Sequence, residues 1–152
     1  MASQSLTVAE FIELPIVKAG LPELVAGEEG IDAEVRWVHP LDVPDVSDLL
    51  RGGEMVRTAG VAVGEGAAAQ RRFVRGLEAE GAVGIAVELG FAWDRELPRA
   101  LVDEADRRHI PMVAFRRGIR FVEVSEVSMA ACLIPATPWP GAAKIFTVPS
   151  TV

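Results

Sequence analysis

Apolar positions in the middle of the chain repeat with two different periods. Three short apolar segments have the length of strands, at residues 54–58, 83–87 and 112–115. Between them, residues 67–80 and 97–108 repeat their apolar side chains every three or four positions, as amphipathic helices do. This alternation predicts an α/β fold in one domain, with a parallel βαβαβ sheet as its core, flanking helices and right-handed crossovers.

The N-terminal third predicts less regular structure. Thr7 and Glu10 have the spacing of a capping box, so a short helix is expected over residues 8–14, before a proline. Residues 15–34 contain many glycines and prolines and predict turns. Residues 35–38 predict one more strand, because the segment is mostly apolar and ends before a proline.

The sequence also predicts two further helices, and its composition changes after residue 133. Residues 44–50 predict a short helix with Pro and Asp in its first turn, and residues 121–132 predict a last helix. The segment 134–152 is rich in proline and apolar residues and has one charged residue, Lys144. We therefore expect a folded domain over residues 1–133, followed by an atypical tail.

The charge balance argues against a nucleic-acid-binding surface. The chain of 152 residues has 22 acidic and 15 basic side chains, which gives a formal net charge of −7. Its arginines are scattered as pairs, whereas binding to phosphate backbones requires clustered Lys and Arg. Direct binding of nucleic acid by this chain is therefore not expected.

The cysteine and histidine content argues against a disulfide and against a metal site. The single cysteine, Cys132, excludes an internal disulfide, and two histidines without suitable spacing do not predict a metal site. Residues 1–5 lack the basic and apolar regions of a signal peptide, and no apolar run approaches the roughly 20 residues of a membrane span. These features predict a cytoplasmic protein without metal, cofactor or membrane contact.

Polar and small residues follow each of the three central strands. Thr58 and Gly60 follow the first strand, Glu88 and Gly90 follow the second, and Arg116 follows the third. Ligands of open parallel sheets bind outside the carboxyl ends of the strands, so these residues predict a site for a small polar effector. The alternative is that they are ordinary loop residues, with glycines that the turns require.

Trp37 and His39 alternate with Val38 on the preceding strand and should share one face. The pair has the right shape to stack on a flat heterocycle. The competing interpretation places Trp37 in the core and gives His39 a backbone partner, because apolar faces usually pack.

An ordered set of motifs resembles the N-terminal domain of the PucR (purine catabolism regulatory protein-like) family of bacterial transcriptional regulators. The motifs are Val25–Gly30, Val35–His39, Leu49–Gly60, Val87–Gly90 and Phe121–Glu126. The chain differs from the usual family pattern at Arg57 and Ala59, where an apolar residue and a second threonine are expected.

This resemblance implies a regulatory module that senses an effector, with purine breakdown products such as urate or allantoin as the candidates. It implies a homo-oligomer, and it places the helix-turn-helix that binds DNA outside this chain. Two rival functions stay open. One is a dimerisation module without a ligand, and the other is a small hydrolase or transferase that uses Glu88 and His39. Since the sequence lacks a nucleophile elbow, a Walker loop and a dinucleotide fingerprint, we expect no enzyme activity.

Overall fold

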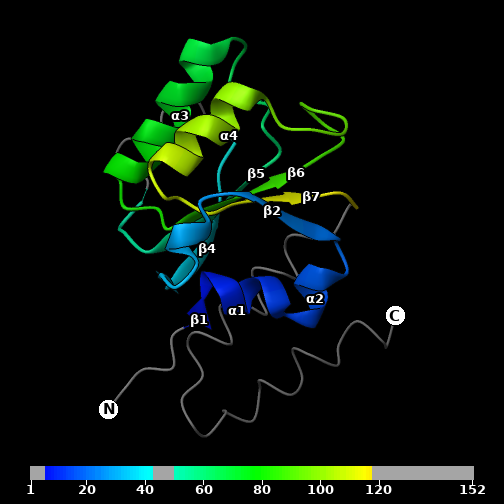
Figure 1. Ribbon diagram of the computed structural model, residues 1–152, viewed down its shortest axis with the longest axis vertical. Helices are drawn as coiled ribbons and strands as arrows, with labels where there is room; N and C mark the ends of the chain where they lie inside the picture. The colour runs from blue at the N-terminus through cyan, green and yellow to red at the C-terminus, as the bar shows by residue number, and fades with distance from the viewer. Residues whose placement is uncertain (1–5, 43–49, 118–152) are drawn as a thin grey trace, which may run out of the picture.

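The computed structural model describes residues 6–42 and 50–117. At its centre is a five-stranded sheet with the strand order β2-β7-β6-β5-β4 (Figure 1). Its strands are β2 (Pro22–Ala26), β4 (Trp37–Pro40), β5 (Glu54–Thr58), β6 (Gly84–Glu88) and β7 (Met112–Phe115). A second, two-stranded sheet pairs β1 (Leu6–Thr7) with β3 (Glu34–Val35).

The predicted parallel core is confirmed. β4, β5, β6 and β7 run parallel, and their registers pair Val38 with Met55, Val56 with Ile85, and Ala86 with Val113. The crossovers contain α3 (Ala67–Ala79) between β5 and β6, and α4 (Arg99–Arg107) between β6 and β7. Each of these elements lies within two residues of the range that the sequence pattern indicates.

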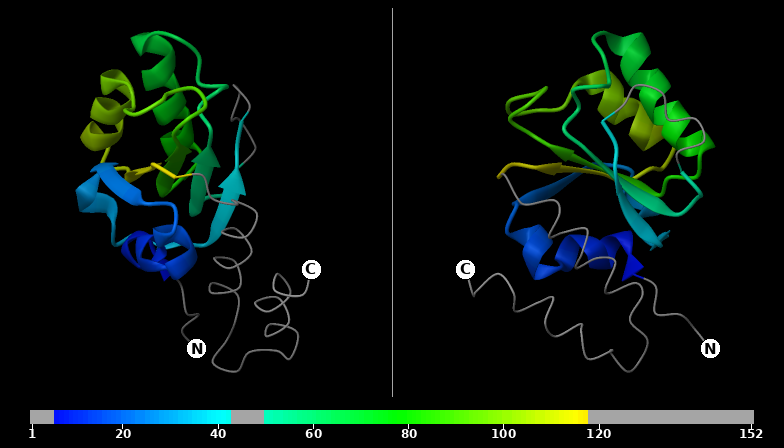
Figure 2. Two further views of the ribbon diagram at one scale, coloured as in Figure 1. Left: turned by 90° about the vertical axis from the view of Figure 1, so that its right-hand side faces the viewer. Right: turned by 180° about the vertical axis from the view of Figure 1, so that it is seen from behind.

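Helices cover both faces of the sheet, and each face has its own core (Figures 1 and 2). α3 and α4 pack over one face, and their apolar sides meet strand residues such as Val56 and Ile85. On the other face lie α1 (Val8–Glu13) and α2 (Pro15–Lys18), where Phe11 packs with Met55 and Phe115. Burial on both faces explains why β7 is apolar throughout and β6 is apolar up to its last residue, Glu88.

The capping box at the start of α1 is also confirmed. The Thr7 hydroxyl accepts a hydrogen bond from the Glu10 N–H at 3.1 Å, and the Glu10 carboxylate accepts one from the Thr7 N–H at 3.0 Å. These bonds satisfy backbone donors that a helix start otherwise leaves without partners.

Residues 15–34, predicted as rich in turns, contain more regular structure than the sequence indicated. This segment contains α2, the strand β2 and the short 3-10 helix η1 (Glu28–Gly30). β2 is antiparallel to β7 and forms one edge of the sheet, with Pro22 opposite Phe115. Pro22 is the first residue of the strand, where its missing N–H costs no hydrogen bond of the ladder. A residue that is typical of turns therefore stands at the start of a strand.

Three predictions fall outside the described residues. They are the helix at 44–50, of which only Leu50 is described, the helix at 121–132, and the tail at 134–152. The division of the chain at residue 133 therefore stays a prediction.

Candidate functional site

The carboxyl ends of the four parallel strands lie along one edge of the sheet, which we call the carboxyl edge. It consists of residues 41–42 after β4, the loop 59–66 after β5, the loop 89–98 after β6, and residues 116–117 after β7. The two loops leave the sheet at the same side and lead into the N-termini of α3 and α4 (Figure 1). Gly60, Gly90 and Arg116 belong to this edge, and Thr58 and Glu88 are the last residues of β5 and β6, directly before it.

Asp42 and Thr58 form the polar centre of the edge. The Thr58 hydroxyl donates a hydrogen bond to the Asp42 carboxylate at 2.9 Å and accepts one from the Gly60 N–H at 3.0 Å. Asp42 also accepts from the Ala59 N–H at 3.0 Å. The Thr58 side chain is buried, and its hydroxyl is both a hydrogen-bond donor and an acceptor. It therefore stabilises the loop and orients the Asp42 carboxylate.

Asp42 was not singled out in the sequence, although it follows a predicted strand as the other candidates do. Its side chain is 43% exposed, and its second carboxylate oxygen lies 4.0 Å from a guanidinium nitrogen of Arg57. A carboxylate that is oriented by a hydroxyl and a backbone N–H, yet open to solvent, is a suitable acceptor for a ligand with N–H groups.

Gly60 and Trp93 join the two loops of the edge. Gly60 has a φ of 82°, and a Cβ at this position would lie 2.3 Å from the Trp93 ring, so the ring occupies the space that a side chain would need. The Ala92 N–H donates to the Ala59 carbonyl at 3.4 Å, and the Gly90 N–H donates to the Trp93 carbonyl at 2.7 Å. These contacts hold the loops after β5 and β6 against each other.

Arg116 is fixed by the strand that the sequence did not predict. Its Nε donates to the Glu23 carboxylate of β2 at 2.9 Å, and a second nitrogen of the same guanidinium contacts the same oxygen. A third nitrogen donates to the Arg95 carbonyl at 3.2 Å. About half of each of the two side chains stays exposed, with 47% for Arg116 and 49% for Glu23. The guanidinium is therefore oriented at the edge and accessible from solvent.

The sheet register does not bring Thr58, Glu88 and Arg116 onto one face. Thr58 lies opposite Val87, which packs in the α3–α4 core, while Glu88 is the next residue and shares the face of Ala86 in the α1–α2 core. Arg116 follows Phe115, which also belongs to the α1–α2 core, and it contacts the β6–α4 loop. Since neighbouring strand residues point to opposite faces, Thr58 and Arg116 share the α3–α4 face and Glu88 does not.

Trp37 and His39 lie on the edge strand β4, on the side opposite the buried Val38. The interpretation of Trp37 as a core residue is wrong, because its side chain is 42% exposed. Trp37 pairs with Glu54 at the start of β5, so it lies far from the carboxyl edge, while His39 pairs with Val56. His39 and Glu88 lie on opposite faces of the sheet, which gives no support to an enzyme that uses both.

The loop after β5 ends in an open helix N-terminus. Gly64 and Gly66 both have a φ of 91°, and Gly66 caps α3 without any side-chain hydrogen bond. The first turn of α3 contains no acidic residue. One turn later, Gln70 is buried on the same side of the helix as Phe73 and Val74. The signal for Gln70 was present in the sequence as a polar residue within an apolar stripe.

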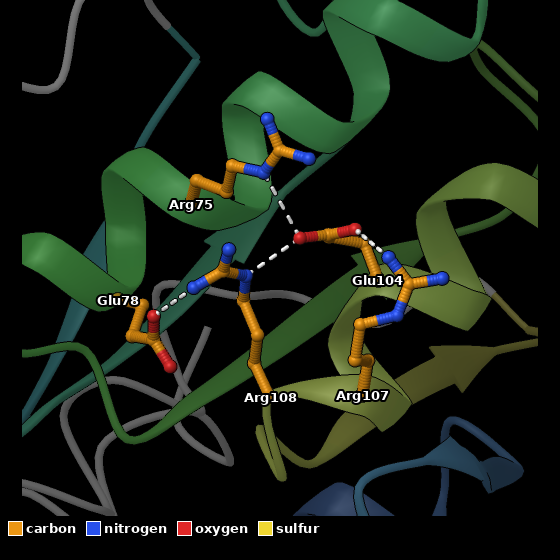
Figure 3. A network of polar contacts seen from close by, with 5 residues as sticks. All are labelled: Arg75, Glu78, Glu104, Arg107 and Arg108. Atoms are coloured by element: carbon orange, nitrogen blue, oxygen red, sulfur yellow. Dashed lines mark hydrogen bonds and ion pairs between the residues drawn. The ribbon is translucent and has the colours of Figure 1, made fainter.

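A second buried polar side chain lies at the other end of the helix pair (Figure 3). Glu104 of α4 is 1% exposed and accepts hydrogen bonds from Arg108 at 2.6 Å, Arg75 at 3.1 Å and Arg107 at 3.3 Å. Arg108 also pairs with Glu78 of α3. The hydrogen bond from Arg108 lowers the pKa of Glu104, supported by Arg75 and opposed by burial. The same pairing raises the pKa of Arg108. This cluster joins α3 to α4.

Two searches of the described residues gave negative results. Among residues 6–42 and 50–117, no group of three or more His, Cys, Asp or Glu side chains is placed to hold a metal ion. Over the same residues, no helix has both the length and the apolar character that a membrane crossing requires.

A solved structure with a similar fold is the CBS and DRTGG domains of the regulatory region of Clostridium perfringens pyrophosphatase, in complex with its activator diadenosine tetraphosphate. The TM-score is 0.51 at 11% identity, and the match covers 100% of this chain and 66% of that chain. At this identity the likeness shows the fold alone.

Two curated relatives are transcriptional regulators. The transcriptional activator PmfR of Paenarthrobacter nicotinovorans is 29% identical over 134 residues, which are 86% of this chain and 27% of PmfR. The purine catabolism regulatory protein of Bacillus subtilis (strain 168) is 22% identical over 110 residues, which are 72% of this chain and 20% of that protein. The chain thus spans about a quarter or less of the length of these relatives.

The profile of the purine catabolism regulatory protein-like family matches residues 10–131. This range covers most of the 152 residues and includes the whole parallel sheet with both crossover helices. The chain therefore belongs to the PucR family.

Proposed function

We propose that this chain is the regulatory domain of a PucR-type transcriptional regulator and that it binds a small effector at the carboxyl edge. The effector would be a polar molecule with both hydrogen-bond donors and acceptors, and purine breakdown products such as urate and allantoin are the first candidates. The domain itself would catalyse no reaction, and DNA would be bound by a part of the regulator outside this chain.

The observation that carries this proposal is the pair of oriented, half-exposed charges at the edge. Asp42 is held by Thr58 and the Ala59 N–H, and Arg116 is held by Glu23 and a carbonyl. An acceptor and a donor that are fixed in advance bind a ligand at lower entropic cost than mobile side chains do. Membership in a family of transcriptional regulators supports the regulatory role.

The test is a thermal-shift screen of the chain with purines and their breakdown products, followed by calorimetry on any compound that raises the Tm. Asp42→Asn and Arg116→Ala should each weaken binding by about tenfold, because each removes a hydrogen bond to a charged group. Arg117→Ala is the matched control, since it removes a neighbouring exposed charge. Glu88→Ala should leave the affinity unchanged, because Glu88 lies on the other face.

Two results would overturn the proposal. One is that no compound stabilises the chain. The other is that a stabilising compound binds Asp42→Asn and Arg116→Ala as tightly as the unsubstituted chain, which would place its site elsewhere.

A second candidate function is protein association through the same edge. Of the four large apolar side chains that are exposed among the described residues, three lie at the carboxyl edge: Leu21 is 51% exposed, Val61 69% and Phe91 64%. Leu21 belongs to the edge because its carbonyl accepts from the Arg116 N–H. Sedimentation of the chain and of a Val61→Ser, Phe91→Ser double variant tests this alternative. A dimer that the double variant abolishes would favour it.

A further inference from the structure

The two oriented charges of the carboxyl edge each have a counter-charge beside them. The Arg116 guanidinium donates from two of its nitrogens to one oxygen of the Glu23 carboxylate. The second oxygen of the Asp42 carboxylate lies 4.0 Å from a guanidinium nitrogen of Arg57. Opposite charges at such distances attract each other and offset each other's field, so the charge at each end of the edge is largely compensated within the protein.

Each pair keeps hydrogen-bonding groups that a ligand can use. A guanidinium has five N–H groups, and Arg116 uses three of them on Glu23 and on the Arg95 carbonyl, so two remain. The first oxygen of the Asp42 carboxylate accepts from a hydroxyl and from a backbone N–H, whereas its second oxygen accepts neither of these bonds. The edge therefore offers donors at one end and an acceptor at the other end, without an excess of charge at either.

The loops of the edge add no excess of positive charge. Within the described part of these loops, three exposed carboxylates stand against two exposed guanidinium groups. They are those of Glu65, Asp94 and Glu96, and those of Arg95 and Arg117. An anion that approaches the edge therefore meets at least as much negative as positive charge, and the field of the loops does not attract it.

The strand order sets the distance between the two ends. Asp42 is hydrogen-bonded at the end of β5, Arg116 follows β7, and β6 lies between these two strands. Two steps between neighbouring strands amount to about 10 Å. A ligand that forms a hydrogen bond of about 2.9 Å at each end then needs a donor and an acceptor about 4–5 Å apart. This is the scale of one small heterocycle or of a ureide, and it is shorter than a nucleotide.

We propose that the effector is a neutral cyclic ureide or lactam, with an N–H group on the Asp42 carboxylate and a carbonyl oxygen on the Arg116 guanidinium. This inference rests on the proposed function, since it assigns the chemical class of the ligand at the same site. A neutral amide group satisfies both ends and leaves both charge pairs intact. A carboxylate would instead compete with Glu23 for Arg116 and would lie near Asp42, so the site selects against it.

Allantoin and allantoate are the matched probes for this preference. Allantoate is the product of hydrolytic ring opening of allantoin, and it has a carboxylate where allantoin has a ring carbonyl. Calorimetry of the whole chain with each compound, at neutral pH and constant ionic strength, measures the two affinities. We expect allantoin to bind at least about fivefold more tightly than allantoate, because only allantoate brings a further negative charge to the compensated pairs.

Glu23→Gln tests the cause of the preference, since it keeps the shape of the side chain and removes the counter-charge of Arg116. It should lower the ratio of the two affinities by about fivefold and should leave the affinity for allantoin within about twofold. The retained affinity for the neutral compound shows that the site is still folded. Glu65→Gln is the matched control, because it removes an exposed carboxylate of the same edge that is not bonded to Arg116. It should change the ratio by less than about twofold.

The outcomes distinguish this inference from the proposed function. If allantoate or urate binds as tightly as allantoin and loses affinity in Asp42→Asn and Arg116→Ala, the neutral effector is wrong and the proposed function stands. A ratio of affinities that Glu23→Gln leaves unchanged would also overturn the neutral effector, as would a screen in which no neutral compound binds. If allantoin binds Asp42→Asn and Arg116→Ala with unchanged affinity, the proposed site is wrong, and this inference is wrong with it.

Discussion

Gln70 and Glu104 are both buried polar residues on the crossover helices, but their surroundings differ completely. Glu104 lies near the C-terminus of α4, where three arginines donate hydrogen bonds to its carboxylate. Gln70 lies near the N-terminus of α3, at an end of the helix that no side chain caps. We call the end of the helix pair at Glu104 the closed end, because its side chains pair with one another. We call the end at Gly66 the open end, because no side chain caps α3 there. We infer that the closed end stabilises the fold.

The largest expected effect comes from removing the carboxylate at the closed end. Glu104→Ala should lower the free energy of unfolding by about 3 kcal/mol, because it removes buried volume and leaves Arg75, Arg107 and Arg108 without their shared acceptor. Denaturation in urea measures this loss. Asp103→Ala is the control on the same helix, where an exposed i,i+4 pair with Arg99 predicts a loss below about 1 kcal/mol. Equal effects of the two substitutions would contradict the comparison.

The next effect concerns the packing of the open end. Gly60→Ala should destabilise the chain by about 2 kcal/mol, because its Cβ would clash with the Trp93 ring in a backbone conformation of φ 82°. Gly66→Ala has a similar positive φ of 91° and no atom within 4 Å of the added Cβ. Its loss should therefore be smaller, and the difference between the two variants isolates the contact with Trp93. If Gly66→Ala costs as much, the ring does not hold the loops together.

The pH dependence of stability tests how much the Glu104 carboxylate contributes at the closed end. Arg108 and Arg75 hold the pKa of Glu104 below its ordinary value, against the effect of burial. A depressed pKa means that this stabilisation is complete above the unfolded value of about 4.3 and is lost as the pH falls through the folded pKa. The difference in Tm between the unsubstituted chain and Glu104→Gln should be constant from pH 7 to about 5 and should shrink below about pH 4. A difference that persists unchanged in acid would assign the effect to packing.

The smallest expected effect has the opposite sign. Gln70→Leu should stabilise the free chain by about 1 kcal/mol, because it replaces a polar side chain that is 9% exposed by an apolar one of similar volume next to Phe73 and Val74. Denaturation in urea gives the sign directly. A loss of stability on this substitution would mean that the amide makes contacts that the apolar side chain cannot replace.

The central elements of the fold were readable from local patterns. The strands 54–58 and 112–115 and the helix that begins at Ala67 agree with their predicted bounds within one residue, because apolar periodicity and Gly or Pro signals act over a few positions. The parallel sheet followed from their order. In contrast, β2 was missed, because a five-residue edge strand that begins with Pro22 has no distinct local pattern and forms only when β7 is beside it.

The site depended on information that no local pattern contains. The sequence named the strand ends correctly, but the side of the sheet on which Thr58 and Glu88 lie depends on the register of β5 against β6. A shift of one residue in that register reverses the face. Asp42 and Glu23 acquire their roles from partners 16 and 93 residues away, on other strands.

The sequence by itself determined which segments become strands and helices, the parallel order of the central sheet and the family, because these follow from short-range periodicity and from ordered motifs. Only the tertiary structure decided which buried polar groups have partners. Glu104 of α4 and Arg75 of α3 meet because two helices pack side by side, and Thr58 meets Asp42 because β4 and β5 pair. Burial and hydrogen bonding are properties of packed surfaces, and residues distant in the chain create them together.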